Sequence, residues 1–181
     1  MHKMADDTRY DTASATRHII RVTLVGAVAN VILAAVKIVV GVMGLGGRGR
    51  ALLTALVKRS DIHIKYLCDC DTRVAGAATE IVMEGLDYKP KFVQDFRTML
   101  ADPELDALIC STSDRWHALA TIMGCQAGKD VYVEKPQSMS VWDGQQMIAA
   151  SRKYERIVQV GMQSRSAPYV QSALDYIQSG K

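Results

Sequence analysis

Short apolar runs alternate with longer amphipathic stretches between residues 38 and 179. Polar and glycine-rich turns bound the apolar runs, as is typical of strands that are buried on both faces. The runs predict strands at residues 38–43, 62–68, 91–93, 105–110, 131–133 and 157–160. The stretches between and after them predict helices at residues 51–58, 72–83, 94–100, 116–127, 141–154 and 168–179. This alternation predicts an α/β fold with a doubly wound parallel sheet and helices on both faces.

A glycine-rich turn joins the first predicted strand to the first predicted helix. Its glycines have the spacing G-x-G-x-x-G, and the turn consists of Gly44, Leu45, Gly46, Gly47, Arg48 and Gly49. Gly44 permits a tight turn, Gly46 lets the backbone approach a pyrophosphate, and Gly49 lets the helix pack closely on the strand. The free N–H groups at the helix N-terminus would hold the phosphates. The pattern predicts a dinucleotide site, and a purely structural glycine turn is the alternative.

An acidic residue follows the second predicted strand, as a dinucleotide site requires. Asp69 lies 20 residues after Gly49, and its carboxylate can accept hydrogen bonds from both ribose hydroxyls of an adenosine. A carboxylate there repels a 2′-phosphate, which favours NAD over NADP, although Arg73 lies near enough in sequence to weaken this preference. The alternative role for Asp69 is to cap the next helix together with Asp71.

Polar residues also follow the fourth and fifth predicted strands, so they should face the same crevice. Ser111 and Thr112 suit a loop that is pressed against a cofactor. His117 would begin a helix near the nicotinamide end, and a structural hydrogen-bonding role is the alternative. Lys135 precedes Pro136, which disfavours a helix and admits a cis peptide bond that would hold the ammonium group at a fixed angle. A partly buried lysine can donate or accept a proton, whereas a surface turn is the alternative.

Five segments together resemble the Gfo/Idh/MocA family of oxidoreductases, which includes glucose–fructose oxidoreductase and inositol dehydrogenase. The segments are residues 44–49, 68–71, 113–117, 127–136 and 159–165, and the resemblance spans about residues 37–181. The run Gly-Lys-x-Val-x-x-Glu-Lys-Pro, which ends at Pro136, is highly specific. The family's loop after the fourth strand usually reads Thr-Pro, and here Ser113 replaces the proline.

The resemblance implies an NAD(P)-dependent oxidoreductase that transfers hydride between nicotinamide and a sugar, cyclitol or related polyol. Lys135 would be the catalytic or substrate-orienting lysine and would hydrogen-bond the reacting hydroxyl. Trp116, His117 and Glu134 would line the nicotinamide region, and the substrate side would carry Gln163 and Arg165. The remaining cofactor-binding residues would be the glycine turn with Asp69, Arg73, Ser111 and Thr112. A few members of this fold use NAD in glycoside cleavage, so an NAD-dependent glycosidase is an alternative.

A second α/β domain follows in this family and closes the active site. The pattern here ends with the helix at 168–179, so residues 37–160 are expected to form the dinucleotide-binding domain. Residues 161–181 are expected to be a linker and the start of a truncated substrate domain. Such a chain would bind a dinucleotide with little turnover, and its exposed apolar surface would favour association, including homo-oligomers.

Residues 1–36 have a different pattern from the rest of the chain. A polar tail precedes an apolar stretch at 19–36, which has no charged residue from 22 to 36 and is apolar all round. This stretch predicts an appended helix that contacts a membrane or packs on a partner, and a secretory leader is the alternative. Residues 17–41 also resemble the first transmembrane helix of cation diffusion facilitator transporters. Residues 38–43 distinguish a nucleotide-binding protein from a membrane-anchored or transporter-derived fragment. A nucleotide site needs these residues as a strand, whereas the fragment needs them as part of a continuous helix.

Composition and charge restrict the partners further. The chain is 49% hydrophobic and 23% charged, and its net charge of +3 comes without a basic patch interleaved with aromatic residues, which argues against nucleic acid. The cysteines lack zinc-ligand spacing, so no metal is expected; they are Cys68, Cys70, Cys110 and Cys125. Reduced thiols indicate a cytoplasmic protein, with membrane association through residues 19–36 left open.

Overall fold

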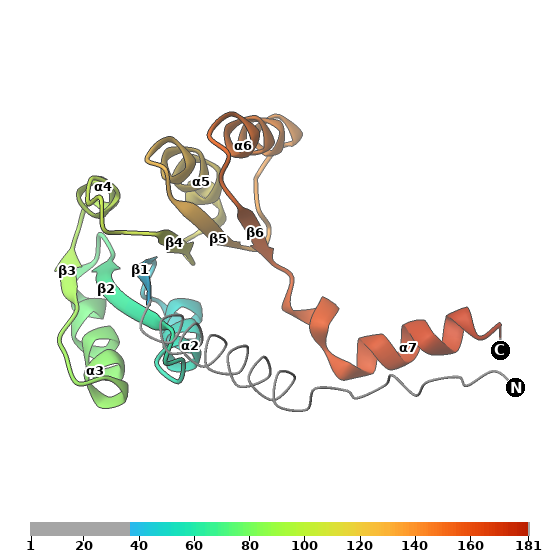
Figure 1. Ribbon diagram of the computed structural model, residues 1–181, viewed down its shortest axis with the longest axis horizontal. Helices are drawn as coiled ribbons and strands as arrows, with labels where there is room; N and C mark the ends of the chain where they lie inside the picture. The colour runs from blue at the N-terminus through green and yellow to red at the C-terminus, as the bar shows by residue number, and fades with distance from the viewer. Residues whose placement is uncertain (1–36, 181) are drawn as a thin grey trace, which may run out of the picture. The chain divides into compact units, whose positions relative to one another are not determined.

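The computed structural model describes residues 37–180, apart from the side chain of residue 166, and shows a six-stranded parallel sheet (Figure 1). The strands are β1 (Ile38–Met43), β2 (Ile62–Cys68), β3 (Lys91–Val93), β4 (Ala107–Cys110), β5 (Asp130–Glu134) and β6 (Val158–Gly161). They lie in the order β3-β2-β1-β4-β5-β6, so the direction of winding reverses between β1 and β4. Open parallel sheets bind ligands at such a switch point. The predicted doubly wound parallel sheet is therefore confirmed.

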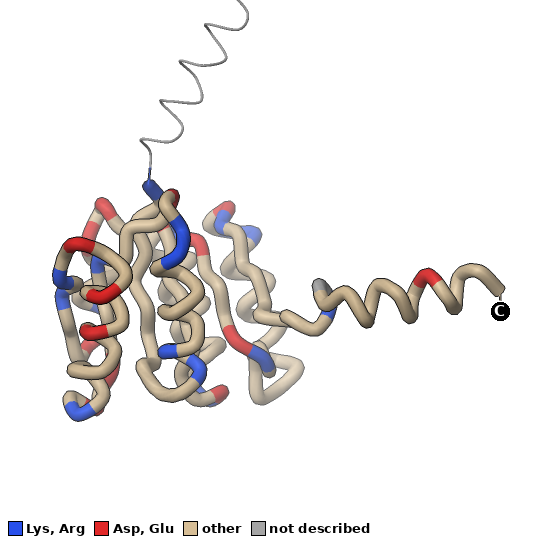
Figure 2. The backbone as a smooth tube through the Cα atoms, turned by 90° about the horizontal axis from the view of Figure 1, so that it is seen from below, with Lys and Arg blue, Asp and Glu red and all other residues tan. Residues whose placement is uncertain are grey.

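Helices cover both faces of this sheet (Figure 1). The α-helices are α2 (Gly47–Leu56), α3 (Ala75–Gly85), α4 (Phe96–Leu100), α5 (His117–Gln126), α6 (Val141–Lys153) and α7 (Pro168–Gln178). Three 3₁₀ helices are η1 (Thr72–Val74), η2 (Asp114–Trp116) and η3 (Gln163–Ser166). None of the residues of α7 is buried, and its one charged residue is Asp175 (Figure 2).

Each face of the sheet has its own hydrophobic cluster. On one face, Leu53 of α2 and Val82 of α3 pack with the apolar side chains of β1 and β2. On the other face, Met99 of α4, Ala120 of α5 and Met147 of α6 pack with side chains of β4 and β5. Complete burial of one large apolar side chain stabilises a fold by about 1.5–3 kcal/mol. These two clusters hold the strand ends, and therefore the loops that follow them, in fixed positions.

Helix starts differ from the predicted ones where a cap or the glycine turn sets them. α2 begins at Gly47, four residues before the predicted start, because Gly46 is extended and Arg50 donates the first helical hydrogen bond to the Gly46 carbonyl at 2.9 Å. α4 begins only after Asp95, whose carboxylate accepts a hydrogen bond from the Arg97 amide at 2.9 Å. A capping carboxylate satisfies an N–H group that would have no partner within the helix.

β1 decides between the two interpretations of residues 38–43. It pairs in parallel with β2 along its length and with β4 over residues 40–43, so it lies in the centre of the sheet. A transmembrane helix that continues through these residues is therefore excluded, and the resemblance to cation diffusion facilitators is wrong for residues 38–41. In the part of the chain that the structure describes, no helix combines the length and hydropathy needed to span a bilayer. The apolar stretch at 19–36 and its predicted helix lie outside the described residues.

Candidate functional site

The predicted site residues follow strand ends at one edge of the sheet. Gly44 follows β1, Asp69 follows β2, Ser111 follows β4 and Lys135 follows β5. Gln163 opens η3 just after β6. Because all the strands are parallel, their carboxyl ends lie at the same edge. The prediction that these residues share one edge is confirmed.

The glycine turn is packed too tightly for side chains at two positions. Gly44 has a φ of +87°, and a Cβ there would come within 2.6 Å of the Ser111 carbonyl carbon. A Cβ on Gly49 would collide with the carbonyl oxygen of Gly44. The Ser111 hydroxyl donates a hydrogen bond to that same oxygen at 2.8 Å. The tight turn at Gly44 and the close packing of the helix at Gly49 are therefore both present.

Open space lies in front of the N-terminus of α2. A Cβ built on Gly46 would meet no atom within 4 Å. The amides of Gly47, Arg48 and Gly49 precede the first helical hydrogen bond, so they have no partner within the helix. Free amides and the positive end of the helix dipole together form an anion site. This end of α2 has room and donors for a phosphate group.

Asp69 is tied to the glycine turn. One oxygen of its carboxylate accepts a hydrogen bond from the Leu45 amide at 2.8 Å, and the other accepts one from the Asp71 amide at 3.0 Å. Oδ1 also accepts a weak hydrogen bond from the Cys70 thiol at 3.7 Å, whereas Oδ2 retains a further lone pair for a ligand hydroxyl. Arg73 lies outside the cavity, where its guanidinium pairs with Asp71 at 2.8 Å and lowers the pKa of that carboxyl. Arg73, which was expected to weaken the preference for NAD, is thus paired with Asp71.

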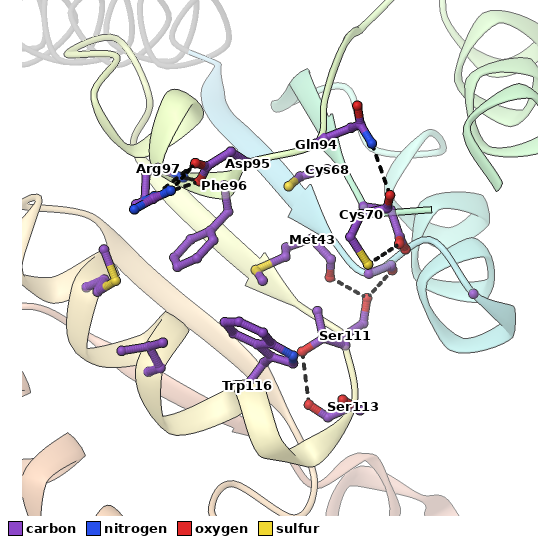
Figure 3. Close-up of a pocket in the computed structure, with 16 residues that line it drawn as sticks. Met43, Cys68, Cys70, Gln94, Asp95, Phe96, Arg97, Ser111, Ser113 and Trp116 are labelled. Atoms are coloured by element: carbon purple, nitrogen blue, oxygen red, sulfur yellow. Dashed lines mark hydrogen bonds and ion pairs between the residues drawn. The ribbon is translucent and has the colours of Figure 1, made fainter. Parts of the chain in front are cut away.

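A cavity of about 760 Å³ opens at this edge of the sheet (Figure 3). Six of the predicted site residues line it, namely Gly44, Gly46, Asp69, Ser111, Thr112 and Trp116. The Trp116 ring lies across the cavity from Phe96, with Met43 between their elements (Figure 3). Trp116 therefore shares this cavity with Asp69, and its expected position beside the nicotinamide stays a prediction.

Sequence reasoning missed the residues that complete this cavity. Six come from the loop after β3, from α4 and from α5, namely Gln94, Asp95, Phe96, Arg97, Leu119 and Met123, and four come from the ends of β1 and β2 and the loops after β2 and β4, namely Met43, Cys68, Cys70 and Ser113. Residues 94–97 follow the end of β3, so the rule that found the other site residues applies to them as well. Leu119 and Met123 are four apart on one helix, a spacing that also suits a buried core face.

His117 is buried and does not line this cavity. Its Nδ1 lies 2.6 Å from the Pro136 carbonyl oxygen, and its Nε2 lies 3.1 Å from the Thr112 carbonyl oxygen. The imidazole therefore joins the loop after β4 to the loop after β5. This arrangement is the structural hydrogen-bonding role that the sequence had left as an alternative.

Glu134 is also buried, and it faces the glycine turn rather than a cavity. Its Oε1 lies 2.6 Å from Nη2 of Arg48 and accepts a hydrogen bond from Nε at 2.7 Å. Burial alone would raise the pKa of Glu134, but the hydrogen bonds from Arg48 and Tyr132 hold that pKa below its usual value. The same ion pair raises the pKa of Arg48. The ion pair connects residues that are 86 positions apart in the sequence.

Lys135 is exposed, so the expectation of a partly buried lysine is wrong for this chain. β5 ends at Glu134, and Lys135 therefore stands past the edge of the sheet; its peptide bond to Pro136 is cis, as the sequence allowed. Gln163 and Arg165 are exposed on η3 and do not line the large cavity. The structure therefore places these three residues at the predicted edge without bringing them into contact with one another.

Comparison with known proteins identifies the family that the chain matches. The GFO_IDH_MocA family model, described as an oxidoreductase family with an NAD-binding Rossmann fold, matches residues 38–162. A glycosyl hydrolase family 109 protein from Shewanella woodyi is 30% identical over 65% of this chain and 26% of its own length. An inositol 2-dehydrogenase from Salmonella paratyphi B is 29% identical over 69% of this chain and 37% of its own length.

A solved structure resembles the fold more extensively. The WlbA dehydrogenase from Bordetella pertussis, in complex with NADH and UDP-GlcNAcA, superposes with a TM-score of 0.72 at 25% identity. The match covers 80% of this chain and 40% of that protein. The chain thus spans about a quarter to two fifths of the length of these relatives.

Proposed function

The chain belongs to the Gfo/Idh/MocA family of oxidoreductases, and we propose that it is the NAD-binding half of an enzyme acting on a sugar, cyclitol or related polyol. In this proposal residues 37–160 form the dinucleotide-binding domain, and residues 161–181 begin the connection to a substrate domain. The family's Rossmann domain is an NAD-binding fold, which makes NAD the cofactor.

The unobstructed N-terminus of α2 is the observation that carries this proposal. The amides of Gly47, Arg48 and Gly49 would hold the pyrophosphate, and the empty space at Gly46 leaves room for it. The Asp69 carboxylate would accept the adenosine ribose hydroxyls, through the lone pair left on Oδ2 and in place of the weak thiol bond on Oδ1. Ser111, Thr112 and Trp116 line the cavity that would receive the adenosine. The amide donors for the pyrophosphate, the carboxylate acceptor for the ribose and the cavity for the adenosine would therefore follow one another in the order of these groups in a dinucleotide.

A preference for NAD over NADP follows from the charges around Asp69. A 2′-phosphate would approach this carboxylate, and the two negative charges would repel each other. Arg73 could offset the repulsion only by leaving its bidentate pair with Asp71. We expect tighter binding of NADH than of NADPH, and Arg73 then has no direct role in the cofactor site.

Lys135 is the residue proposed to act on the substrate. Hydride transfer chemistry is supplied by the nicotinamide when it is bound. Exposed at the sheet edge, the Lys135 ammonium can hydrogen-bond a substrate hydroxyl and stabilise the alkoxide that develops on it. Gln163 and Arg165, exposed on η3 after the neighbouring strand, would contact the substrate from the other side. His117 would hold the loops of Thr112 and Pro136 on either side of the nicotinamide.

A second candidate is an NAD-dependent glycosidase. The 30% identity to the glycosyl hydrolase family 109 protein favours it, because that relative carries a hydrolase name within the same fold. Both candidates need the same dinucleotide site, so the cofactor test below applies to both. Incubation of the complete enzyme with a polyol and with a glycoside would separate them.

The test is a titration of the chain with NADH, followed by nicotinamide fluorescence. We expect saturable binding by the unmodified chain and a loss on the order of tenfold or more for Gly46→Val, because the new side chain fills the phosphate space while meeting no protein atom. Gly76→Val is the control, since a Cβ on Gly76, in the first turn of α3, would also meet no atom within 4 Å and Gly76 does not line the cavity. Equal binding by the unmodified chain and Gly46→Val would contradict the proposal.

A further inference from the structure

An ion pair crosses from the glycine turn to the strand that precedes Lys135. Arg48 is the second residue of α2, and Glu134 is the last residue of β5, directly before Lys135. Two guanidinium nitrogens of Arg48, Nε and Nη2, face the same oxygen of Glu134 at 2.7 and 2.6 Å. Bonds between charged groups of this length are among the stronger polar contacts in proteins.

Two further residues fix the position of the Glu134 carboxylate. The Tyr132 hydroxyl donates a hydrogen bond to Oε1 of Glu134 at 3.0 Å. Gly161, the last residue of β6, leaves the space that this hydroxyl occupies. A Cβ on Gly161 would collide with the Tyr132 hydroxyl and would come within 2.9 Å of Oε1 of Glu134. Residues from α2, β5 and β6 therefore meet at one carboxylate.

Arg48 and Glu134 differ in the exposure of their side chains. The Glu134 side chain is 5% exposed, so it has almost no surface to offer a ligand. The Arg48 side chain is 40% exposed, and its bonds to Glu134 use Nε and Nη2, so that Nη1 is not bound to that carboxylate. Arg48 also stands in the first turn of α2, beside the free amides that would hold the pyrophosphate. The guanidinium thus keeps an exposed part on a residue that adjoins these amides in the sequence.

We propose that Glu134 is a positioning residue that acts through Arg48, and that Arg48 binds the pyrophosphate of the cofactor; this inference rests on the proposed function. Tyr132 and Gly161 support the same arrangement by holding the carboxylate in place. A long side chain that is already fixed loses less conformational entropy when its ligand arrives. Glu134 therefore contributes to cofactor affinity without touching the cofactor, which differs from the nicotinamide contact that the family resemblance implied.

The test is a double-mutant cycle on NADH affinity with Arg48→Met, Glu134→Leu and the combined variant. We expect Arg48→Met and Glu134→Leu each to weaken NADH binding on the order of tenfold. Because Glu134 acts only through Arg48, the combined variant should bind NADH within about twofold of Arg48→Met. Gly161→Ala should weaken binding in the same direction. The proposal would be overturned if the combined variant lost NADH affinity by the product of the two single losses, or if Glu134→Leu bound NADH as tightly as the unmodified chain.

A matched control exists elsewhere in the chain. The Asp102 carboxylate accepts a hydrogen bond from the Tyr66 hydroxyl at 2.7 Å and pairs with Lys65 at 2.6 Å, and none of these residues lines the cavity. Asp102→Leu therefore removes the same kind of tyrosine, carboxylate and cation cluster without approaching the phosphate site. We expect it to lower stability and to leave NADH affinity within about twofold. If Glu134→Leu does not fold, Glu134→Gln keeps an oxygen for Arg48 and should show a smaller loss in the same cycle.

Two competing ligands identify the group that Arg48 binds. ADP carries the pyrophosphate and adenosine does not, and both can be measured by displacement of NADH. Arg48→Met and Glu134→Leu should weaken the binding of ADP and leave the affinity for adenosine unchanged. Equal loss of affinity for both ligands would contradict a phosphate contact. A failure of the unmodified chain to bind NADH would contradict the proposed function itself. Binding of NADH with no effect of Glu134→Leu would contradict this inference alone.

Discussion

Single glycines in the turn after β1 have different physical tasks. Gly49 has no room for a Cβ, because the carbonyl oxygen of Gly44 occupies that position. Gly46 has open space around it, so the fold itself does not exclude a side chain there. The sequence spacing predicted the helix packing at Gly49, and the approach of a ligand to Gly46 stays a prediction of the same G-x-G-x-x-G pattern.

This difference predicts a large stability effect at Gly49. Gly49→Ala should lower the free energy of unfolding by about 3 kcal/mol or more, because the methyl group must displace backbone rather than a flexible side chain. Urea unfolding followed by circular dichroism measures this loss. Gly46→Ala is the control and should unfold within about 1 kcal/mol of the unmodified chain. An unchanged midpoint for Gly49→Ala would contradict the packing at the turn.

At the scale of secondary-structure elements, the strands were easier to predict than the walls of the site. β1, β2 and β3 have the predicted bounds, because each is a short apolar run between turn residues. The Arg48 and Glu134 pair could not be predicted, since its partners come from elements that are distant in sequence and meet only in the folded sheet. The exposure of Lys135 also depends on where β5 ends relative to its neighbours.

The position of Trp116 in the wall of the cavity predicts energy transfer from its indole to bound NADH. Of the two tryptophans, Trp116 lines the cavity and Trp142 lies on the exposed side of α6. Excitation of the indoles should transfer energy to bound NADH mainly from Trp116, because it is the nearer donor. Trp116→Phe should remove most of the sensitised nicotinamide emission, and Trp142→Phe should retain it. The reverse result would place NADH away from this cavity.

The whole molecule carries an acid-sensitive contact outside the site. Lys65 and the Tyr66 hydroxyl lower the pKa of Asp102 well below its usual value. A carboxyl whose pKa is lower in the folded state stabilises the fold above its unfolded pKa of about 3.9, and that stabilisation disappears as the pH falls. Asp102→Asn should therefore destabilise the chain at pH 7 and have a shrinking effect below about pH 4.

Thermal unfolding of both proteins across this pH range measures the effect. The control is Asp87→Asn, because Asp87 has no hydrogen bond or ion pair in the part of the chain that the structure describes. A destabilisation by Asp102→Asn that is the same at every pH would contradict a role for the ionised carboxylate.

Exposed apolar residues on α7 also matter at the scale of the whole molecule. Tyr169, Tyr176 and Ile177 are each more than half exposed, and no residue of this helix is buried. The chain spans about a quarter to two fifths of the length of its relatives. The proposal of a homo-oligomer and the proposal of a following substrate domain both provide a cover for this surface.

Hydrogen exchange of the backbone amides, with and without saturating NADH, tests the central claim most directly. The free amides of Gly47, Arg48 and Gly49 should exchange several-fold more slowly when the pyrophosphate accepts their hydrogen bonds. The loops at Asp69 and Ser111 should also be protected, while α7 should not change. Slowing at these three places would establish the dinucleotide site on this turn. Unchanged exchange at residues 47–49, at an NADH concentration that saturates any binding, would contradict it.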